Sequence, residues 1–317
     1  MSYSYTVAIR TLGTAGEKYQ KLLNSLERLT VSAESINVYI AEGYPLPKET
    51  IGMEKYKYVK KGMLSQRALD YNDVHSEYIL FLDDDIVLPS DAVETMFKYL
   101  HKYKGDAISP DIFDNSKRGK VAELQMVMSG RMLPRRDDGR WGYKVMRNGG
   151  YSYNKTPSKE VYESQTNAGA CFLCRKAVFQ SINLMEETWI DSLPYPLGED
   201  QITYYKMHKK GFKILTYYNH NILHLDGGNN MSSEKERARL YCDQYFKIVF
   251  WHRFIYMPEK KFIVKLMDCI ALVYTIMFSI FSSLLKFRFE ILSVKTSAIR
   301  EGIRFIRSTT YKSLPII

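Results

Sequence analysis

The chain has 317 residues, of which 45% are apolar and 25% charged, as in ordinary globular proteins. This composition excludes a disordered tail protein, a collagen-like fibre and a chain built mostly of membrane helices. The 45 Lys and Arg residues outnumber the 35 Asp and Glu residues, giving a net charge of +10. A basic chain favours anionic partners such as nucleic acid, acidic lipid or phosphorylated substrates.

Patterns typical of strands and helices alternate through the first 110 residues. Short apolar runs predict strands at 5–12, 36–41, 56–60, 78–82 and 107–109. Helices are predicted between them: one with Tyr19, Leu22, Leu23 and Leu26 at helical spacing, one after Gly62 that includes Arg67, and one that begins near Ser90 or Asp91. This alternation predicts a Rossmann-like α/β fold with a mainly parallel central sheet flanked by helices.

The pattern changes after residue 110. Residues 111–165 are rich in Arg, Asp, Gly and Tyr and predict an irregular hairpin-and-loop insertion, either a solvated surface or a substrate-covering loop. Residues 167–179 predict a buried strand and a short helix. A helix is expected at 198–210, and strands at about 212–217 and 221–225.

Cysteine usage argues against a disulfide framework, because four cysteines are few for this length. Cys171 and Cys174 form a C-x-x-C motif inside a predicted strand. Side chains three positions apart on a strand point to opposite faces, so these thiols should not share a metal or redox site. The N-terminal sequence lacks the apolar core of a signal peptide, which predicts a chain that starts and stays in a reducing cytoplasm.

Three carboxylates, Asp83, Asp84 and Asp85, follow directly on the predicted strand at 78–82. In parallel α/β sheets, ligands bind beyond the carboxyl ends of the strands. Adjacent carboxylates repel one another unless water or a cation lies between them, and oxygen ligands suit Mg²⁺ or Mn²⁺ shared with phosphate. The alternative is a solvated helix N-terminus, which also favours Asp.

A second acidic pair, Glu199 and Asp200, opens the predicted helix at 198–210. A carboxylate placed near the site could take a proton from a hydroxyl nucleophile, although acidic residues also cap many helices. His224 follows in the segment ILHLDGG. It could ligate a metal or donate to a diphosphate, or could be an ordinary hydrogen-bonded loop histidine.

Taken together, these motifs resemble the family 2 glycosyltransferases, which have the GT-A fold. The segments that carry the resemblance are Glu42 after a strand, Gly62 with Arg67, YILFLDDD, Asn167-Ala168-Gly169, GEDQ and ILHLDGG, in that order over about residues 5–230. The resemblance implies inverting transfer of a sugar from a nucleotide-diphospho-sugar, most commonly a UDP-sugar, to a hydroxyl of a glycan or lipid-linked saccharide in bacterial surface polysaccharide biosynthesis.

The resemblance also implies roles for individual residues. Asp200 is expected to be the general base, with Glu199 beside it to orient or bind the acceptor. Asp85 is expected to hold the divalent cation, with Asp83 and His224 as further candidates. The expected nucleotide-binding residues are Thr11, Glu42, Arg67, Asp83 and Asp84, with Asp83 near the ribose.

The tail predicts a helical, basic and aromatic extension over residues 231–317, after a catalytic domain at 1–230. Its segment 269–285 has no charged residue and is short for a bilayer span. A buried core helix, an interfacial helix and a span are all compatible with it. The basic residues after 285 favour an in-plane or re-entrant helix at the cytoplasmic face of the inner membrane, on anionic lipid, with the aromatic residues 250–256 at the headgroup boundary.

Two other functions are compatible with parts of the sequence. A sugar nucleotidyltransferase would use a Gly-rich loop after the first strand, and TLGTAGEK offers Gly13, Gly16 and Lys18. A non-enzymatic, membrane-docked binding protein would explain the tail alone. Nucleic acid is not an expected partner, because the sequence has no RNA-binding aromatic motif, zinc finger or helix-turn-helix signal.

Overall fold

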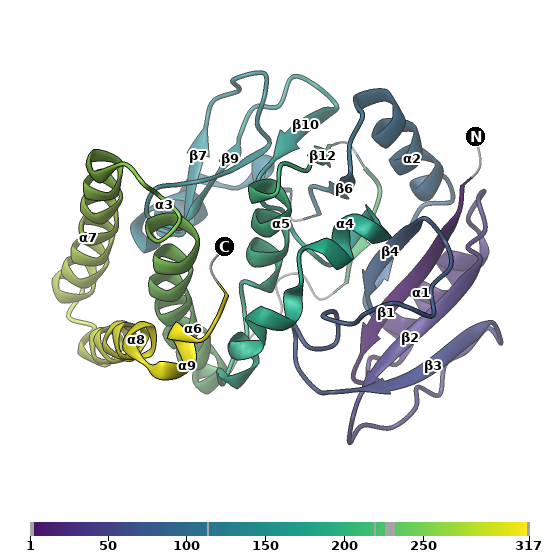
Figure 1. Ribbon diagram of the computed structural model, residues 1–317, viewed down its shortest axis with the longest axis horizontal. Coiled ribbons are helices and arrows are strands. Elements are labelled where there is room, and N and C mark those ends of the chain that lie inside the picture. Colours follow the sequence, from purple (N-terminus) through teal and green to yellow (C-terminus); the bar gives the residue numbers. More distant parts are fainter. Residues whose placement is uncertain (1–2, 113, 219, 226–231, 316–317) are drawn as a thin grey trace.

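The computed structural model describes residues 3–112, 114–218, 220–225 and 232–315 (Figure 1). Its centre is an eight-stranded sheet. In spatial order the strands are β10 (Val161–Ser164), β12 (Ile214–Tyr217), β6 (Ala107–Pro110), β11 (Cys171–Arg175), β4 (Tyr78–Asp83), β1 (Tyr5–Thr11), β2 (Ser35–Ala41) and β3 (Glu54–Val59). β10 and β11 run antiparallel to their neighbours, and the other pairings are parallel. The predicted mainly parallel α/β sheet is therefore confirmed.

Each face of the sheet is covered by helices, because the strands carry apolar side chains on both faces. α1 (Glu17–Glu27) and α2 (Ala92–Tyr103) pack over one face, and α4 (Lys176–Ser181) and α5 (Glu199–Lys209) cover the other. Cys171 belongs to the core cluster of the first face and Cys174 to that of the second. The predicted separation of the two thiols is confirmed, and burial raises the pKa of both.

The insertion at 111–165 is more regular than its composition predicts. It forms a second sheet of three strands, β7 (Met132–Arg135), β9 (Tyr151–Asn154) and β8 (Tyr143–Val145), with η1 (Asn115–Lys117) and α3 (Lys120–Ser129) before it. The expectation of irregular structure is wrong for α3. This helix has no buried residue and exposes Val121 and Leu124, so its sequence lacks the apolar stripe that predicts a helix.

The segment after Gly62 also differs from its prediction. Residues 62–67 form consecutive turns and not a helix. Asp191, in η2 (Leu184–Ser192), holds these turns by accepting hydrogen bonds from the backbone N–H groups of Leu64 (2.9 Å) and Ser65 (2.8 Å) and from the Ser65 hydroxyl (2.6 Å). Two hydrogen bonds of helical spacing form here, from the Gln66 N–H to the Gly62 carbonyl (3.0 Å) and from the Ala68 N–H to the Leu64 carbonyl (2.8 Å), but they do not extend into a helix.

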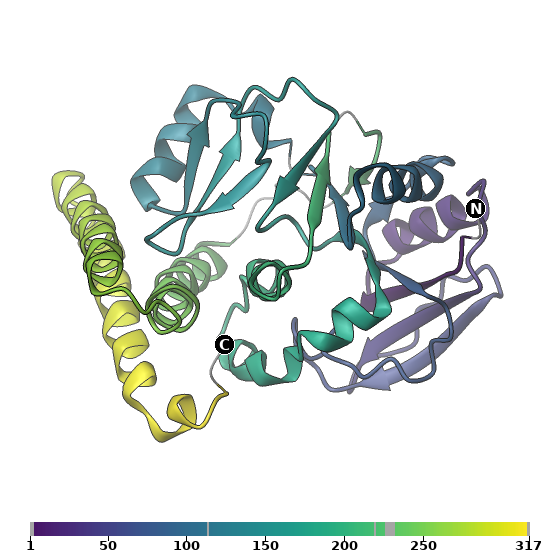
Figure 2. The same cartoon turned by 45° about the horizontal axis from the view of Figure 1, so that its top comes forward.

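Helices make up the C-terminal part of the chain, and α7 and α8 lie at the end of the molecule opposite β1–β3 (Figures 1 and 2). They are α6 (Ser233–Phe250), the π-helical η3 (Trp251–Tyr256), α7 (Phe262–Leu285), α8 (Phe289–Arg307) and α9 (Thr309–Lys312). The predicted boundary at 230 falls outside the described residues, so the division into two domains stays a prediction.

The sequence suggested that the aromatic residues 250–256, at the end of α6 and in η3, lie at a surface. Three of them do not. Phe250, Trp251 and Phe254 are buried, and the Phe250 ring lies 5.7 Å from that of Tyr205 on α5. The expectation of a headgroup position is wrong for these three residues, because α6 and η3 complete the core on the α5 side of the sheet.

A buried ion cluster ties η3 to the rest of the core. Glu187 has no exposed surface and accepts two hydrogen bonds of 2.8 Å from the Arg253 guanidinium. It also accepts bonds from Lys206 on α5 (3.1 Å) and from the Trp189 indole (3.0 Å). Removing one partner of such a cluster leaves an uncompensated buried charge, which costs about 3–5 kcal/mol in other proteins.

α7 buries most of its polar residues and exposes most of its large apolar residues. Its inward face carries Leu272 and four polar residues, and three of the four have a side-chain partner: Asp268 pairs with Arg147 (2.8 Å), Thr275 accepts from Asn148 (2.8 Å), and Ser283 accepts from Lys295 (2.9 Å). Its outward face exposes large apolar side chains, including Phe262, Ile263, Ile270, Val273, Tyr274, Met277, Phe281 and Leu285. In the part of the chain that the structure describes, α7 is the one helix long and apolar enough to cross a membrane.

Candidate active site

The carboxyl end of β4 brings Asp83 against two arginines. β1 and β4 are parallel neighbours whose register places Arg10 beside Asp83. The Arg10 guanidinium donates to both Asp83 oxygens, at 2.6 and 3.0 Å, and Arg67 Nη2 donates to Oδ1 at 2.7 Å. Burial would raise the pKa of Asp83, but the two guanidinium groups outweigh it and hold that pKa below its usual value. Asp83 is therefore ionised and fixed in place.

Asp84 is held by the end of β1. Its Oδ2 accepts a hydrogen bond of 2.5 Å from the Thr11 hydroxyl, and Thr11 Oγ1 in turn accepts one of 2.8 Å from the Gly13 N–H. Burial and the neighbouring charges of Asp83 and Asp85 raise the pKa of Asp84 to about 6, despite the Thr11 bond. Its position makes Asp84 a brace between the turn and the loop after β1.

Asp85 lies beside His224, as the sequence predicted for a shared site. The backbone holds the two together, because β5 (Ile86–Val87) pairs with β13 (Leu223–His224), and the Leu225 N–H donates to the Asp85 carbonyl at 2.9 Å. Their side chains meet with His224 Nε2 3.1 Å from Asp85 Oδ2. The Gly227-Gly228 part of this motif lies outside the described residues.

The second acidic pair begins α5 and faces the same arginines. Arg10 Nη2 donates to Glu199 Oε1 at 3.1 Å, and Arg67 Nη1 lies 3.4 Å from Asp200 Oδ1. One guanidinium, that of Arg67, thus contacts both Asp83 and Asp200. Burial and the charge of Asp200 raise the pKa of Glu199 to about 7. Asp85 and Asp200 are 115 positions apart in the sequence. The two acidic motifs nevertheless meet at the same arginines in the fold.

Gly169 makes this approach possible. A Cβ at residue 169 would lie 1.9 Å from Asp200 Oδ1 and 2.6 Å from Arg67 Nη1, so no other residue fits without moving them. The turn before α5 is equally tight: Gly198 has a φ of +90°, and a Cβ there would lie 2.4 Å from the Phe246 ring of α6. Both glycines therefore set the position of Asp200.

A cleft of about 740 Å³ opens beside the acidic turn. Three of the five predicted nucleotide-binding residues line it: Thr11, Asp83 and Asp84. Arg67 does not line the cleft but donates a hydrogen bond to Asp83, which does. Glu42 is exposed just after β2 and is not among the lining residues. The lining is Arg10, Thr11, Leu12, Thr14, Ala15, Lys18, Lys61, Gly62, Met63, Gln66, Asp83, Asp84, Asp85, Asp191, Leu193, Pro194, Pro196 and His224.

Asp200 lines a separate, smaller cavity of about 90 Å³. Its other walls come from the insertion and from the start of α5, and they are mostly polar: Asn115, Arg131, Tyr143, Tyr151, Thr166, Asn167, Ala168, Gly198 and Gln201. The Tyr143 hydroxyl donates to Asp111 and accepts from Asn115, so this wall is fixed by hydrogen bonds. Asp83 and Asp200 thus face different cavities while sharing Arg67.

The carboxylates suit a cation only in part. Asp83, Asp85 and His224 line the same cleft, but the oxygens of Asp83 are paired with Arg10 and Arg67. Among the described residues, no three His, Cys, Asp or Glu side chains form a group that could hold a metal ion. Mg²⁺ and similar ions, however, often take one or two protein ligands and complete their shell with phosphate oxygens and water. Asp85 and His224 fit that type of site.

Sequence patterns missed three residues of the site. Arg10 is the counter-ion of Asp83 and Glu199, and a charged residue inside an otherwise apolar strand was the signal for it. Asp191 holds the turns that carry Arg67, and Arg131 lines the Asp200 cavity. Nothing local in the sequence marks Asp191 or Arg131, since both act through contacts distant in the chain.

Comparison with known proteins identifies the fold. No family model and no curated protein matches the sequence. The structure is similar to the crystal structure of GalNAc-T7 with UDP, GalNAc and Mn²⁺, with a TM-score of 0.51 and 13% identity. The similarity covers 81% of this chain and 51% of the other, so this chain spans about half the length of that protein. The fold is that of a GT-A glycosyltransferase, a mainly parallel sheet flanked by helices, with additional helices at the C-terminus.

Proposed function

We propose that this chain is an inverting glycosyltransferase of the family 2 type, which moves a sugar from a nucleotide-diphospho-sugar to a hydroxyl group. The observation that carries the proposal is the shared Arg67 guanidinium, which contacts Asp83 beside the large cleft and Asp200 beside the small cavity. Displacement at an anomeric carbon needs the leaving group and the nucleophile on opposite faces of the sugar. Two carboxylate sites facing two cavities fit that requirement.

The cleft of about 740 Å³ is the proposed donor site. Lys18 and Lys61 supply positive charge along its wall, and its volume suits a nucleotide-sugar. Asp85 and His224 are the residues that would hold Mn²⁺ or Mg²⁺ with the donor diphosphate, and such a cation neutralises charge that develops on a leaving diphosphate. A UDP-sugar is the first donor to test, because the similar structure holds UDP and Mn²⁺.

The cavity that contains Asp200 is the proposed acceptor site. Asp200 takes the proton of the acceptor hydroxyl as the new bond from oxygen to the anomeric carbon forms. The bond from that carbon to the phosphate oxygen breaks, and the nucleoside diphosphate leaves. Arg67 orients Asp200 by direct contact, and Arg10 holds Glu199 in place at the preceding position of the helix.

The acceptor is proposed to be a lipid-linked saccharide at the cytoplasmic face of a bacterial inner membrane. The exposed apolar face of α7 supports membrane association, because Asp268 and Thr275 are turned inward and paired while large apolar side chains face outward. Fractionation of expressing cells tests this point. Recovery of the whole protein in the soluble fraction without detergent would remove the case for a membrane acceptor, but not for sugar transfer.

Ligand-induced thermal stabilisation tests the function itself. A ligand at a concentration well above its Kd raises the melting temperature by mass action. UDP with Mn²⁺ should raise the melting temperature of this protein, and hydrolysis of a panel of nucleotide-sugars should then identify the donor. Stabilisation by nucleoside triphosphates, with none by UDP, would instead favour the nucleotidyltransferase alternative, whose Gly-rich loop includes Lys18 in the same cleft.

A further inference from the structure

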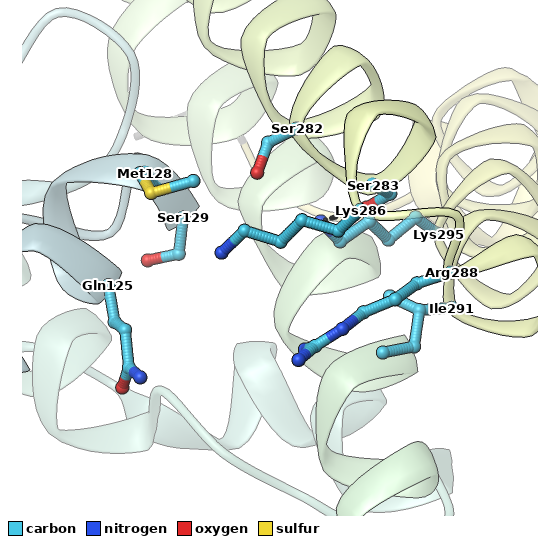
Figure 3. A pocket seen from close by; sticks show the side chains of 9 residues that line it. All are labelled: Gln125, Met128, Ser129, Ser282, Ser283, Lys286, Arg288, Ile291 and Lys295. Carbon is cyan, nitrogen blue, oxygen red and sulfur yellow. Dashed lines mark hydrogen bonds between the residues drawn. The ribbon is translucent and has the colours of Figure 1, made fainter.

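A small basic pocket lies between α3, the end of α7 and the first half of α8 (Figure 3). Its volume is about 150 Å³, several times the space of about 30 Å³ that one water molecule occupies in the liquid. Figure 3 shows Lys286 and Arg288 extending from the turn between α7 and α8 into the open space, toward α3. The lining residues are Gln125, Met128, Ser129, Ser282, Ser283, Lys286, Arg288, Ile291 and Lys295.

None of the residues that line this pocket neutralises its positive charge. Its lining has three cations and no carboxylate. The Lys295 ammonium donates hydrogen bonds to the Ser279 carbonyl (3.0 Å) and to the Ser283 hydroxyl (2.9 Å). Lys286 and Arg288 form no ion pair with any residue that the structure describes. Burial lowers the pKa of Lys295, and so does the positive charge of Lys247, Lys286 and Arg288, which outweighs the contribution of Asp243.

Exposed aromatic residues adjoin these two cations in the sequence. Phe287, between Lys286 and Arg288, is 80% exposed, and Phe289 is 62% exposed. They continue the exposed apolar face of α7, which ends at Phe281 and Leu285. Cations and aromatic rings at the end of an apolar helix are typical of the headgroup level of a membrane, where lipid phosphate lies beside hydrocarbon. A free phosphate ion would gain nothing from these rings.

We propose that the pocket binds the phosphate group of an anionic phospholipid, whose acyl chains lie against the exposed face of α7. The inference rests on the membrane association proposed above and names the lipid chemistry that it uses. The same short segment contributes to both sites, since Ser129 lines this pocket and Arg131, two residues on, lines the Asp200 cavity.

Vesicle sedimentation tests the proposal with the full chain and without donor or acceptor. The probes are phosphatidylcholine vesicles with and without phosphatidylglycerol. The wild type should bind the anionic vesicles more tightly. The double variant Lys286→Gln, Arg288→Gln should bind them at least about tenfold more weakly, because each cation at an anionic surface contributes about fivefold. Both residues are exposed and make no described ion pair, so the variant should fold.

The matched control is the double variant Lys55→Gln, Lys60→Gln, which removes two exposed cations on and just after β3, at the end of the molecule opposite α7 and α8 (Figure 1). It should lose less than about threefold, as distant charges on a screened surface do. Equal losses in the two variants would mean general electrostatic attraction and would overturn the pocket. Stabilisation of the wild type by inorganic phosphate, without vesicle binding, would assign a soluble anion instead. Intact sugar transfer to a soluble acceptor in the Lys286→Gln, Arg288→Gln variant would keep either failure separate from the proposed enzyme activity.

Discussion

Charge is used in opposite ways at the two ends of the molecule. At the carboxyl ends of β1 and β4, Arg10 and Arg67 form ion pairs with Asp83, Glu199 and Asp200. At the turn between α7 and α8, Lys286 and Arg288 have no described carboxylate partner and stand among exposed apolar residues. Internal pairing fixes side chains for chemistry on a small ligand. Unpaired charge on a surface is available to an external partner, so the two regions should respond differently to the loss of a cation or an anion.

The largest expected effect is on catalysis. Asp200→Asn keeps the shape of the site but removes the base, so the rate of transfer should fall by about 10²–10⁴-fold. Donor binding, measured by UDP–Mn²⁺ thermal stabilisation, should survive. The control is Asp73→Asn, which changes a half-exposed carboxylate paired only at 3.8 Å with Lys57. Weakened donor binding with normal turnover would refute the assignment of Asp200 as the base.

Arg10→Gln should cost stability as well as activity. The variant leaves Asp83 and Glu199 with less positive charge in a buried setting, and loss of one partner from such a network costs about 3–5 kcal/mol. Chemical denaturation with a two-state fit measures the free energy of unfolding. A loss of under about 1 kcal/mol would mean that water already compensates these carboxylates.

Gly169→Ala should reduce transfer without unfolding the protein. The added methyl group would meet Asp200 Oδ1 at 1.9 Å, so Asp200 and Arg67 must move apart. A displacement of about 1 Å in a catalytic group can cost about 100-fold in rate. Gly119→Ala is the control, because a Cβ there meets nothing within 4 Å. Similar rates for the two variants would show that the site tolerates the displacement.

Glu199→Gln should change how stability depends on pH. The pKa of Glu199 is about 7 in the folded protein and 4.5 as its ordinary value, so the native state binds the extra proton and loses stability as the pH rises from about 4.5 to about 7. The Gln variant lacks this loss. Its stability relative to the wild type should therefore increase between pH 5 and 8, by about 2 kcal/mol. Parallel curves for the two proteins would contradict the raised pKa.

The smallest effect belongs to the other end of the molecule. Lys286→Gln, Arg288→Gln should leave the free energy of unfolding within about 0.5 kcal/mol of the wild type, as surface substitutions usually do. Denaturation in the absence of lipid measures it. The contrast with Arg10→Gln is the sharpest form of the comparison, since both variants remove guanidinium charge. A large loss of stability would mean that the two cations are internal partners after all.

Local patterns predicted the features that depend on neighbours in sequence. Strand periodicity and the acidic run after residue 82 fixed the place of Asp83–Asp85, and Glu199 and Asp200 were predicted from the start of their helix. Arg10 was not found, because its role depends on the register of β1 against β4. α3 was missed because it lacks an apolar stripe. The structure gives positions but tests no role, so all the expected roles stay predictions: those of Asp200 and Glu199 in catalysis, of Thr11, Glu42, Arg67, Asp83 and Asp84 in nucleotide binding, and of Asp83, Asp85 and His224 at a metal.

The tail shows a different limit of sequence patterns. Hydropathy marked residues 269–285 but could not tell which face turns inward, because apolar residues occupy nearly every turn. The spacing of the polar residues indicates which face turns inward. Asp268, Thr275, Ser279 and Ser283 recur at intervals of seven and four residues, which places them on one side of a helix. Their burial, together with that of Leu272, shows that this side of the helix packs against the protein.

The contacts of α6 and η3 have a practical consequence for anyone who would shorten this protein to make it easier to purify. Cutting the chain before α6 would remove Phe246 from Gly198, next to Asp200, and would take Arg253 away from the buried Glu187. The remaining sheet would lose the helices that pack behind α5. A better approach to solubility is to keep all the helices and replace outward apolar residues of α7, such as Ile270 and Val273, with polar ones.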